Sequence, residues 1–480
     1  MAPLVPAVGR SRWRRRSALR GAAAVVFAPL ALLAGCGRSA RARPQTSAST
    51  VIVSFQFHWA NGAPWNSHTT AIVQQFLDQT FNQRTRGIRA VPWGVCCGKW
   101  SQIIAASLGG AGYPDIIGEC CVGFASLRDA GILSPLDAYM RRDNIPTSLW
   151  SKGHVAVLQA GGHQLGLPMY DGPQVLGYRQ DILDQLGLSY PAPDWTLAEA
   201  VRLWQGCSAA VGGRRRYGAS LEWYPGWEYL LRGFGGTEMN AAGTHCLLDS
   251  PACVAAAEWF YHLLFAQTIT YRTDVAGLAD GSAVFSALGG WDIFNEATLL
   301  GNRFKWNLVP VPSMPHGRFT YANKDFWSLN RACRHPEAAW SVLRWLAAEP
   351  EWQRFIIKTA LLEPSLNSLW NEWEAAILAA APPLHGVAIG YYKEAAQKGY
   401  GIPAPFYTYA PVTARSEIAA GLTQIAGHKV SVKVGFQDIA RQINALEQSS
   451  ASTAPASFAA QRKAQLTRNA RLLSMFVGGD

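Results

Sequence analysis

Two kinds of side chain recur in the segments that follow predicted strands: flat aromatic rings, and carboxylate or amide groups. They are Trp59, Asn61, Glu119, Tyr170, Asp171, Glu222, Trp223, Tyr224, Trp227, Trp291, Asp292, Trp327, Tyr407 and Tyr409. Ligand hydroxyls need hydrogen-bond partners, and C–H faces pack on aromatic planes, so this mixture suits a sugar. Packing in a core is the alternative for each tryptophan, and for Trp59 and Trp327 the sequence favours neither interpretation.

These segments belong to a predicted α/β pattern. Residues 51–55, 89–93 and 113–117 have the apolar composition of strands, and residues 69–83 and 99–108 between them have the composition of helices. Alternation of this kind implies parallel pairing with right-handed crossovers. In such sheets ligands bind outside the carboxyl ends of the strands, where the polar and aromatic side chains lie.

The stretch between residues 162 and 204 joins this pattern to the rest of the chain. We predict two short apolar strands, 164–167 and 175–178, separated by a turn at 170–173 that contains Asp, Gly and Pro. A helix begins at Asp181 and ends at Gly187, since glycine suits the left-handed C-cap.

The order of several motifs resembles one known family. Pro168, Tyr178, Asp181 and the stretch 191–196 are followed by further motifs, and others precede them, at 112–117, 130–137, 249–251, 281–294 and 335–340. Together they resemble the family 1 extracellular solute-binding proteins of bacterial ABC importers, a group that includes maltose- and trehalose-binding proteins. The resemblance covers residues 50–446.

This resemblance implies a type II periplasmic-binding fold, with two lobes that are each a sheet flanked by helices and a hinged cleft between them. The implied lobes are 51–170 with 322–386 and 171–321 with 387–447, followed by a linker and basic tail at 448–480. The segment 170–173 would lie at the hinge. Trp291 falls on the position whose ring stacks on the ligand.

The resemblance also implies a function. The protein would capture a solute, most readily a sugar or oligosaccharide, and deliver it to transmembrane permease subunits, acting as a monomer without cofactor, metal or catalysis. Glu119 followed by Cys120 and Cys121 departs from the family pattern, which leaves the sugar unidentified. A peptide, polyol or glycerophosphodiester remains an alternative.

Residues 1–36 have the pattern of an export signal. Arginines precede an apolar run at 22–33, and Leu33–Cys36 resembles the lipobox of bacterial lipoproteins, in which the cysteine carries lipid such as palmitate. We therefore expect an extracytoplasmic protein anchored through Cys36, with a flexible tether at 37–50. Arg15 and Arg16 leave the twin-arginine export route open.

Charge and composition favour no other class. The net charge is +11, but six arginines and no acidic residue precede Cys36, so the remainder carries only +5. A surplus this small on so long a chain does not argue for nucleic acid. Hydrolase motifs such as Gly-x-Ser-x-Gly are absent. Glu222 and Asp292 as the carboxylate pair of a glycoside hydrolase are the alternative function.

Eight cysteines remain beside Cys36, an even number that favours disulfides outside the cytoplasm. We predict a bridge between the adjacent pair Cys96 and Cys97 and the adjacent pair Cys120 and Cys121, and a second bridge between Cys246 and Cys253. A four-thiolate zinc site is the alternative for the two adjacent pairs.

Overall fold

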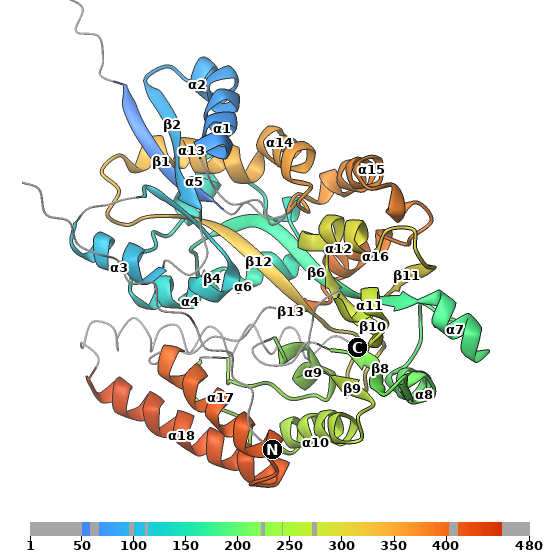
Figure 1. Cartoon of the computed structure of the whole chain (residues 1–480). Coiled ribbons are helices and arrows are strands. Elements are labelled where there is room, and N and C mark those ends of the chain that lie inside the picture. Colours follow the sequence, from blue (N-terminus) through green and yellow to red (C-terminus); the bar gives the residue numbers. More distant parts are fainter. Residues whose placement is uncertain are drawn as a thin grey trace, which may run out of the picture. The chain divides into compact units, whose positions relative to one another are not determined.

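The computed structural model describes residues 50–57, 67–95, 100–110, 114–221, 226–241, 243–270, 276–402 and 411–453. This part of the chain is α/β, as predicted, and most of its strands form one 11-stranded sheet with the central order β2-β1-β3-β12-β6-β10-β8-β7 (Figure 1). The strands of this sheet are β1 (Val51–Phe57), β2 (Ile88–Val95), β3 (Ile116–Glu119), β6 (Leu167–Arg179), β7 (Ala209–Val211), β8 (Arg214–Ser220), β9 (Ile269–Thr270), β10 (Ala283–Gly289), β11 (Trp306–Val309), β12 (Thr320–Leu329) and β13 (Gly401–Ile402). A separate hairpin is formed by β4 (Gln159–Ala160) and β5 (His163–Gln164).

The helices pack on both sides of this sheet. They are α1 (Ser67–Gln79), α2 (Phe81–Arg84), α3 (Trp100–Leu108), α4 (Cys121–Asp129), α5 (Asp137–Arg142), α6 (Lys152–Val157), α7 (Gln180–Leu186), α8 (Leu197–Cys207), α9 (Glu228–Gly233), α10 (Pro251–Phe265), α11 (Ala276–Asp280), α12 (Ile293–Leu300), α13 (Pro336–Ala348), α14 (Pro350–Ala360), α15 (Trp370–Ala380), α16 (Gly390–Gln397), α17 (Pro411–Ala426) and α18 (Val432–Thr453). Short 3₁₀ turns occupy 147–149, 290–292, 367–369 and 382–384.

The first part of the chain folds as its pattern predicts. β1 pairs in parallel with both β2 and β3. These strands contribute to an aromatic core. In it Phe55 and Phe57 each pack edge-to-face with Trp352, and Trp327 packs edge-to-face with both Phe55 and Trp352. These rings are fully buried, so they supply a large apolar area to this half of the sheet.

The strand β6 corrects one prediction. The predicted turn at 170–173 and the predicted strand 175–178 lie in a single strand of 13 residues, which includes only Leu167 of the predicted strand 164–167. The turn does not form because β12 pairs with this segment, Asp171 opposite Lys324, Gly172 opposite Asn323 and Pro173 opposite Ala322. These ladder contacts override the local preference of Asp, Gly and Pro for a turn.

β6 thereby joins two halves of the sheet. Its first half pairs with β12, and its second half pairs with β10 and β11 in antiparallel fashion. Figure 1 shows β6 and β12 lying side by side where the two halves meet. We call this region the crossing. β6 thus belongs to the sheet of each half, and the paired strands form one continuous path.

A second hydrophobic core lies beyond the crossing. Helices α8, α9, α10, α17 and α18 bury Trp204, Trp227, Phe260, Ile418 and Phe436 against β8 and β10. α8 begins in a capping box, with the Thr196 hydroxyl and the Glu199 carboxylate bonded to each other's backbone N–H. α7 ends at Gly187 in the left-handed conformation, as predicted.

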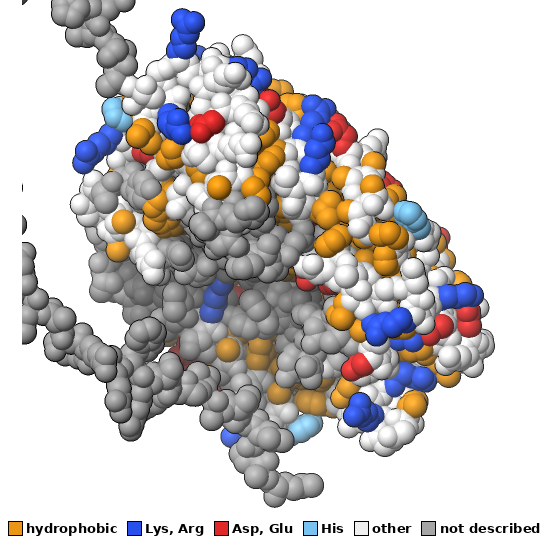
Figure 2. Space-filling view, turned by 45° about the horizontal axis from the view of Figure 1, so that its top comes forward, with side chains coloured by type: hydrophobic (Ala, Val, Ile, Leu, Met, Phe, Trp, Pro, Cys, Tyr) orange, Lys and Arg blue, Asp and Glu red, His pale blue; other side chains and the backbone are white. Residues whose placement is uncertain are grey.

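Two further observations concern the ends and the surface. α18 continues to Thr453, so the start of the predicted linker after Gln448 is helical. No helix in the described ranges is long and apolar enough to cross a membrane. On the face that Figure 2 shows, acidic and basic side chains are interspersed and form no broad patch of one sign.

Candidate functional site

The structure describes about half of the predicted site residues. Outside the described residues lie Trp59, Asn61, Glu222, Trp223, Tyr224, Tyr407 and Tyr409, so their roles stay predictions. Within them lie Glu119, Tyr170, Asp171, Trp227, Trp291, Asp292 and Trp327. Their positions differ greatly in burial and in what they contact.

Three of the described aromatic residues are core residues. Trp327 is fully buried in the first core, and Tyr170 is buried in the same cluster. Trp227 is fully buried in the second core, where its indole N–H donates to Glu238 Oε2 at 2.5 Å. Packing and one buried hydrogen bond therefore account for these rings.

Trp291 is half-buried, and two glycines hold it at the crossing. It lies in the 3₁₀ turn 290–292 between β10 and α12. Its ring lies so close to the backbone that a Cβ at Gly172 would be 2.9 Å from Trp291 Cε3, and a Cβ at Gly289 would be 2.3 Å from Cε2. Any side chain at either glycine would displace the indole, so these glycines fix its orientation.

Two residues of β12 complete this arrangement. The Tyr321 ring stands at 89° to Trp291, with 6.3 Å between the ring centroids. The Tyr321 hydroxyl donates to Asn323 Oδ1 at 3.0 Å, and all three side chains are half-buried. We call Trp291, Tyr321 and Asn323 the aromatic corner. It offers an indole face, a phenol and an amide within one small region.

Sequence reasoning did not single out Tyr321 or Asn323. The sequence offers no motif there, and the alternation appears only in the structure, where Thr320, Ala322 and Lys324 of β12 are buried and the residues between them are half-buried. Because successive side chains of a strand point to opposite faces, this places Tyr321 and Asn323 together.

Asp292 lies beside the corner, immediately after Trp291. Its Oδ1 accepts a hydrogen bond from the Asn295 side-chain amide at 2.6 Å. Burial raises the pKa of this half-buried carboxyl, and the Asn295 bond partly offsets that effect. The carboxyl is therefore a polar group at the edge of the corner, restrained by the first turn of α12.

Asp171 occupies a buried charge network at the crossing. Its carboxylate pairs with Lys324 Nζ and accepts a bond from Ser151 Oγ at 2.7 Å. His154 Nε2 donates to the Asp325 carbonyl at 2.8 Å, which leaves His154 Nδ1 3.7 Å from Asp171. Burial alone would raise the pKa of Asp171, but the Lys324 ammonium and His154 hold it well below its usual value. These contacts satisfy Asp171 inside the protein.

Glu119 is fully buried at the carboxyl end of β3. Its Oε1 accepts from the backbone N–H of Cys120 at 3.0 Å, and the Gln56 amide donates to Oε2 at 3.5 Å. Gln56 lies near the end of β1, so the carboxylate links the ends of two neighbouring strands.

The predicted bridge between Cys246 and Cys253 is wrong for this structure. Both are buried, separate thiols. The Cys253 thiol donates instead to the Thr237 carbonyl at 3.3 Å, and burial raises the pKa of Cys253 to about 11. The bridge between the two adjacent pairs stays a prediction, since Cys96 and Cys97 lie outside the described residues.

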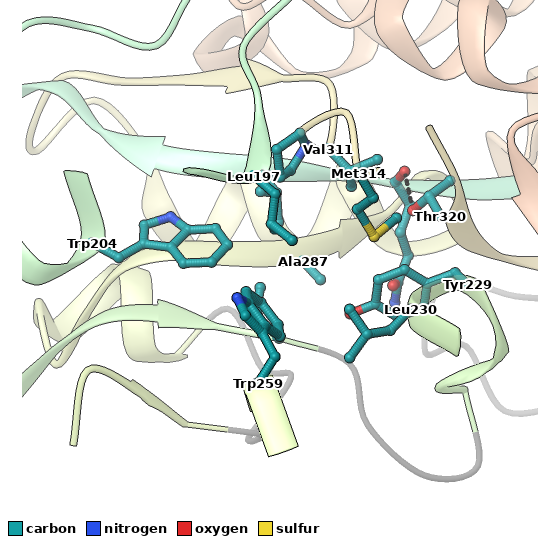
Figure 3. Close-up of a pocket in the computed structure, with 13 residues that line it drawn as sticks. Leu197, Trp204, Tyr229, Leu230, Trp259, Ala287, Val311, Met314 and Thr320 are labelled. Carbon is teal, nitrogen blue, oxygen red and sulfur yellow. Dashed lines mark hydrogen bonds between the residues drawn. The ribbon is translucent and has the colours of Figure 1, made fainter. Parts of the chain in front are cut away.

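An apolar cavity lies in the second core, lined by none of the three residues of the aromatic corner. Figure 3 shows Trp204 and Leu197 of α8, Tyr229 and Leu230 of α9 and Trp259 of α10 around it (Figure 3). Its volume is about 30 Å³, which is room for about two water molecules. It is therefore a packing gap, too small to hold a sugar. None of the groups of His, Cys, Asp and Glu in the described ranges could hold a metal ion.

Two carboxyl groups lie together under the start of α9. Glu238 is fully buried, and its backbone N–H donates to Glu228 Oε2 at 3.0 Å. Burial, followed by the charge of Glu228, raises the pKa of Glu238 to about 8. Glu238 therefore stays protonated near neutral pH.

We expect the variant Glu238→Gln to be more stable than the parent at pH 8.5 but equally stable at pH 4.5. A raised folded-state pKa gives stability that is complete below the unfolded-state value and is lost as pH rises through about 8. Because the amide of the variant does not ionise, the variant avoids this loss. At pH 8.5 its free energy of unfolding should exceed that of the parent by about 2–4 kcal/mol. Thermal melting across this pH range tests it. The exposed Glu258→Gln on α10 is the control and should show no such divergence.

Comparisons with known sequences find one family. A family model for bacterial extracellular solute-binding proteins matches residues 66–351. A putative binding protein of Brucella abortus (strain 2308) is 26% identical over 283 residues. That alignment covers 55% of this chain and 64% of the relative, so the chain spans less than two thirds of the curated protein it matches.

Solved structures share the fold. The sugar-binding protein MalE from the phytopathogen Xanthomonas citri superposes with a TM-score of 0.68 at 15% identity, covering 83% of this chain and 98% of that chain. The cyclic alpha-maltosyl-1,6-maltose binding protein from Arthrobacter globiformis gives 0.66 at 18% identity, covering 84% and 100%. At such identities the likeness shows the two-lobed α/β fold alone.

Proposed function

Because the chain belongs to the bacterial extracellular solute-binding proteins, whose family model covers residues 66–351, we propose that it is the solute receptor of an ABC importer. The solute is a sugar or oligosaccharide, and the protein delivers it to transmembrane permease subunits. Cys36 carries the lipid that keeps the receptor at the outer face of the membrane, and the receptor acts as a monomer. It binds without catalysis.

The observation that carries this proposal is the aromatic corner at the crossing. Trp291 presents an indole face to one side of a sugar ring, and the Tyr321 hydroxyl, the Asn323 amide and the Asp292 carboxyl lie beside it as hydrogen-bonding groups. Aromatic planes with a few convergent polar groups are the chemistry of such sites. The sugar-binding proteins with the same fold support the choice of solute.

The position of the aromatic corner at the crossing explains how the protein would capture its solute. The lobes are 51–170 with 322–386 and 171–321 with 387–447, and β6 and β12 run between them. A solute that touches both lobes favours the closed arrangement by its differential affinity for that state. We expect the remaining contacts from residues that lie outside the described ranges, namely Trp59, Asn61, Glu222, Trp223, Tyr224, Tyr407 and Tyr409.

Binding is tested by measuring the melting temperature of the protein with a panel of mono- and oligosaccharides, and then the affinity by calorimetry. We expect at least one sugar to raise the melting temperature, and Trp291→Ala to weaken its binding about 10- to 100-fold, as truncating an aromatic anchor commonly does. The released solute should be chemically unchanged.

The control variant is Tyr190→Ala, which removes an exposed aromatic ring between α7 and α8 and should bind normally. If no sugar stabilises the protein, the proposed solute class is wrong. If Trp291→Ala binds as tightly as the parent, the corner is not the site. Release of reducing sugar would favour the hydrolase alternative.

A further inference from the structure

A buried carboxyl group lies directly under the turn that carries Trp291. Glu363 comes from the segment after α14 and is only 1% exposed. Neither of its carboxyl oxygens has a hydrogen-bond partner on another described residue. Such a group is costly to bury, so its position calls for a physical reason.

The carboxyl fills a space that two glycines leave open. A Cβ at Gly290 would lie 1.7 Å from Glu363 Oε1, so only glycine fits at the start of the 3₁₀ turn. A Cβ at Gly172 would lie 3.6 Å from the same oxygen and 2.9 Å from Trp291 Cε3. Glu363 and the indole therefore pack against the same piece of β6, with the turn 290–292 between them.

The surroundings of Glu363 are acidic. Asp171 of β6, Asp325 of β12 and Glu296 of α12 face it, and their charges add to burial in raising the pKa of Glu363 well above its ordinary value. The ammonium of Lys324 is paired with Asp171, and His154 Nδ1 lies 3.7 Å from the same carboxylate. Tyr392 of α16 also belongs to this cluster, since the charges of Glu296, Glu363 and Asp292 add to burial in raising its pKa.

Burial and repulsion both raise the pKa of this group, and a hydrogen bond from its own backbone N–H offsets them only in part. We propose that Glu363 is the positioning residue that holds the turn 290–292, and thereby Trp291, in place for solute binding. The neutral carboxylic acid is the form that fits this place, because an ionised Glu363 would add a charge near Asp171 and Asp325, and repulsion would drive it away from Gly290. The inference rests on the proposed function, because it assigns Trp291 the contact with the solute.

The first arm of the test needs no solute and measures the melting temperatures of the parent and of Glu363→Gln between pH 5 and pH 8. If the folded protein keeps Glu363 protonated, each pH unit in this range multiplies the unfolding equilibrium constant of the parent about tenfold relative to the variant. The variant should therefore gain an increasing advantage as pH rises. If the difference in melting temperature between the parent and Glu363→Gln stays constant with pH, Glu363 is not held in its protonated form in the folded protein.

The second arm measures the affinity for the stabilising sugar at pH 7. Glu363→Gln keeps the shape and neutrality of the group and should bind within threefold of the parent. Glu363→Ala empties the space under the turn, and Gly290→Ala pushes the carboxyl out of it, so both should bind at least tenfold more weakly. If Glu363→Gln binds the sugar like the parent and Glu363→Ala does not, the loss of affinity comes from the missing side chain under the turn and not from the loss of the charge-bearing group.

The outcomes distinguish the two proposals. A parent that binds no sugar overturns the proposed function, and the positioning role is lost with it. A parent that binds, together with a Glu363→Ala variant that binds equally well, overturns only the positioning role. The affinity of the parent should also fall at high pH, whereas that of Glu363→Gln should not.

Discussion

Replacing Lys324 by methionine should destabilise the protein by about 3–5 kcal/mol, because it leaves the Asp171 carboxylate buried without its main counter-charge. Lys324 is fully buried, and its ammonium pairs with Asp171 across the two strands of the crossing. The hydrogen bond from Ser151 and the nearby His154 remain, but neither supplies the lost ammonium. Denaturant-induced unfolding at pH 7 measures the change.

The exposed pair Lys398 and Glu394 provides the control. It has an N–O distance of 2.8 Å and the same two charge types, but it lies at the solvent-exposed C-terminal end of α16, so Lys398→Met should change stability far less than Lys324→Met does. Adding Asp171→Asn to Lys324→Met should restore much of the loss, because it removes the uncompensated charge. Equal effects of the two lysine substitutions would mean that the buried pair contributes no more than a surface pair.

The buried pair of Asp171 and Lys324 also makes the stability of the protein depend on pH. The folded-state pKa of Asp171 is lowered by Lys324 and His154, so its contribution to stability is present above the unfolded-state pKa near 4 and is lost as pH falls through the folded value. This direction is opposite to that of Glu238. The parent should therefore lose stability through Asp171 in acid and through Glu238 as pH rises toward 8.

Most of the fold could be predicted because local and long-range preferences agree in it. The parallel order of β1, β2 and β3 follows from strand and helix alternation, and the end of α7 follows from Gly187. β6 could not be predicted as one strand. Its Asp-Gly-Pro segment is a turn sequence, and only pairing with β12, some 150 residues later, makes it extended.

The candidate site was predicted less completely, for a related reason. Residue type and position group Trp291 with Trp227 and Trp327, but they do not tell which aromatic rings face solvent, and Trp227 and Trp327 are fully buried. Nor could they tell a carboxylate that meets a ligand from one that meets a distant lysine, as at Asp171. Tyr321 and Asn323 carry no motif, and only the register of β12 against β6 brings them to Trp291.

The second large effect is expected at Gly118, in the strand β3 that ends at Glu119. A Cβ there would lie 2.1 Å from the Gln56 carbonyl oxygen of β1 and 2.7 Å from Cζ3 of Trp327 on β12. The first contact is with backbone, which no rotamer change can move, and the second is with a ring locked in the aromatic core. Gly118→Ala should therefore cost about 3 kcal/mol or more, the upper range for overpacking.

The matched control is the same substitution at Gly153 in α6, where a Cβ would meet nothing within 4 Å. Alanine is the better helix former, so Gly153→Ala should be neutral or stabilising by up to about 1 kcal/mol. Unfolding midpoints of the two variants measure the contrast. Because Gly118 separates β1 from Trp327, its alanine variant should also disturb the Gln56–Glu119 contact and weaken solute binding. Equal stability of the two variants would mean that β1 and β12 can move apart without cost, which the dense aromatic packing between them argues against.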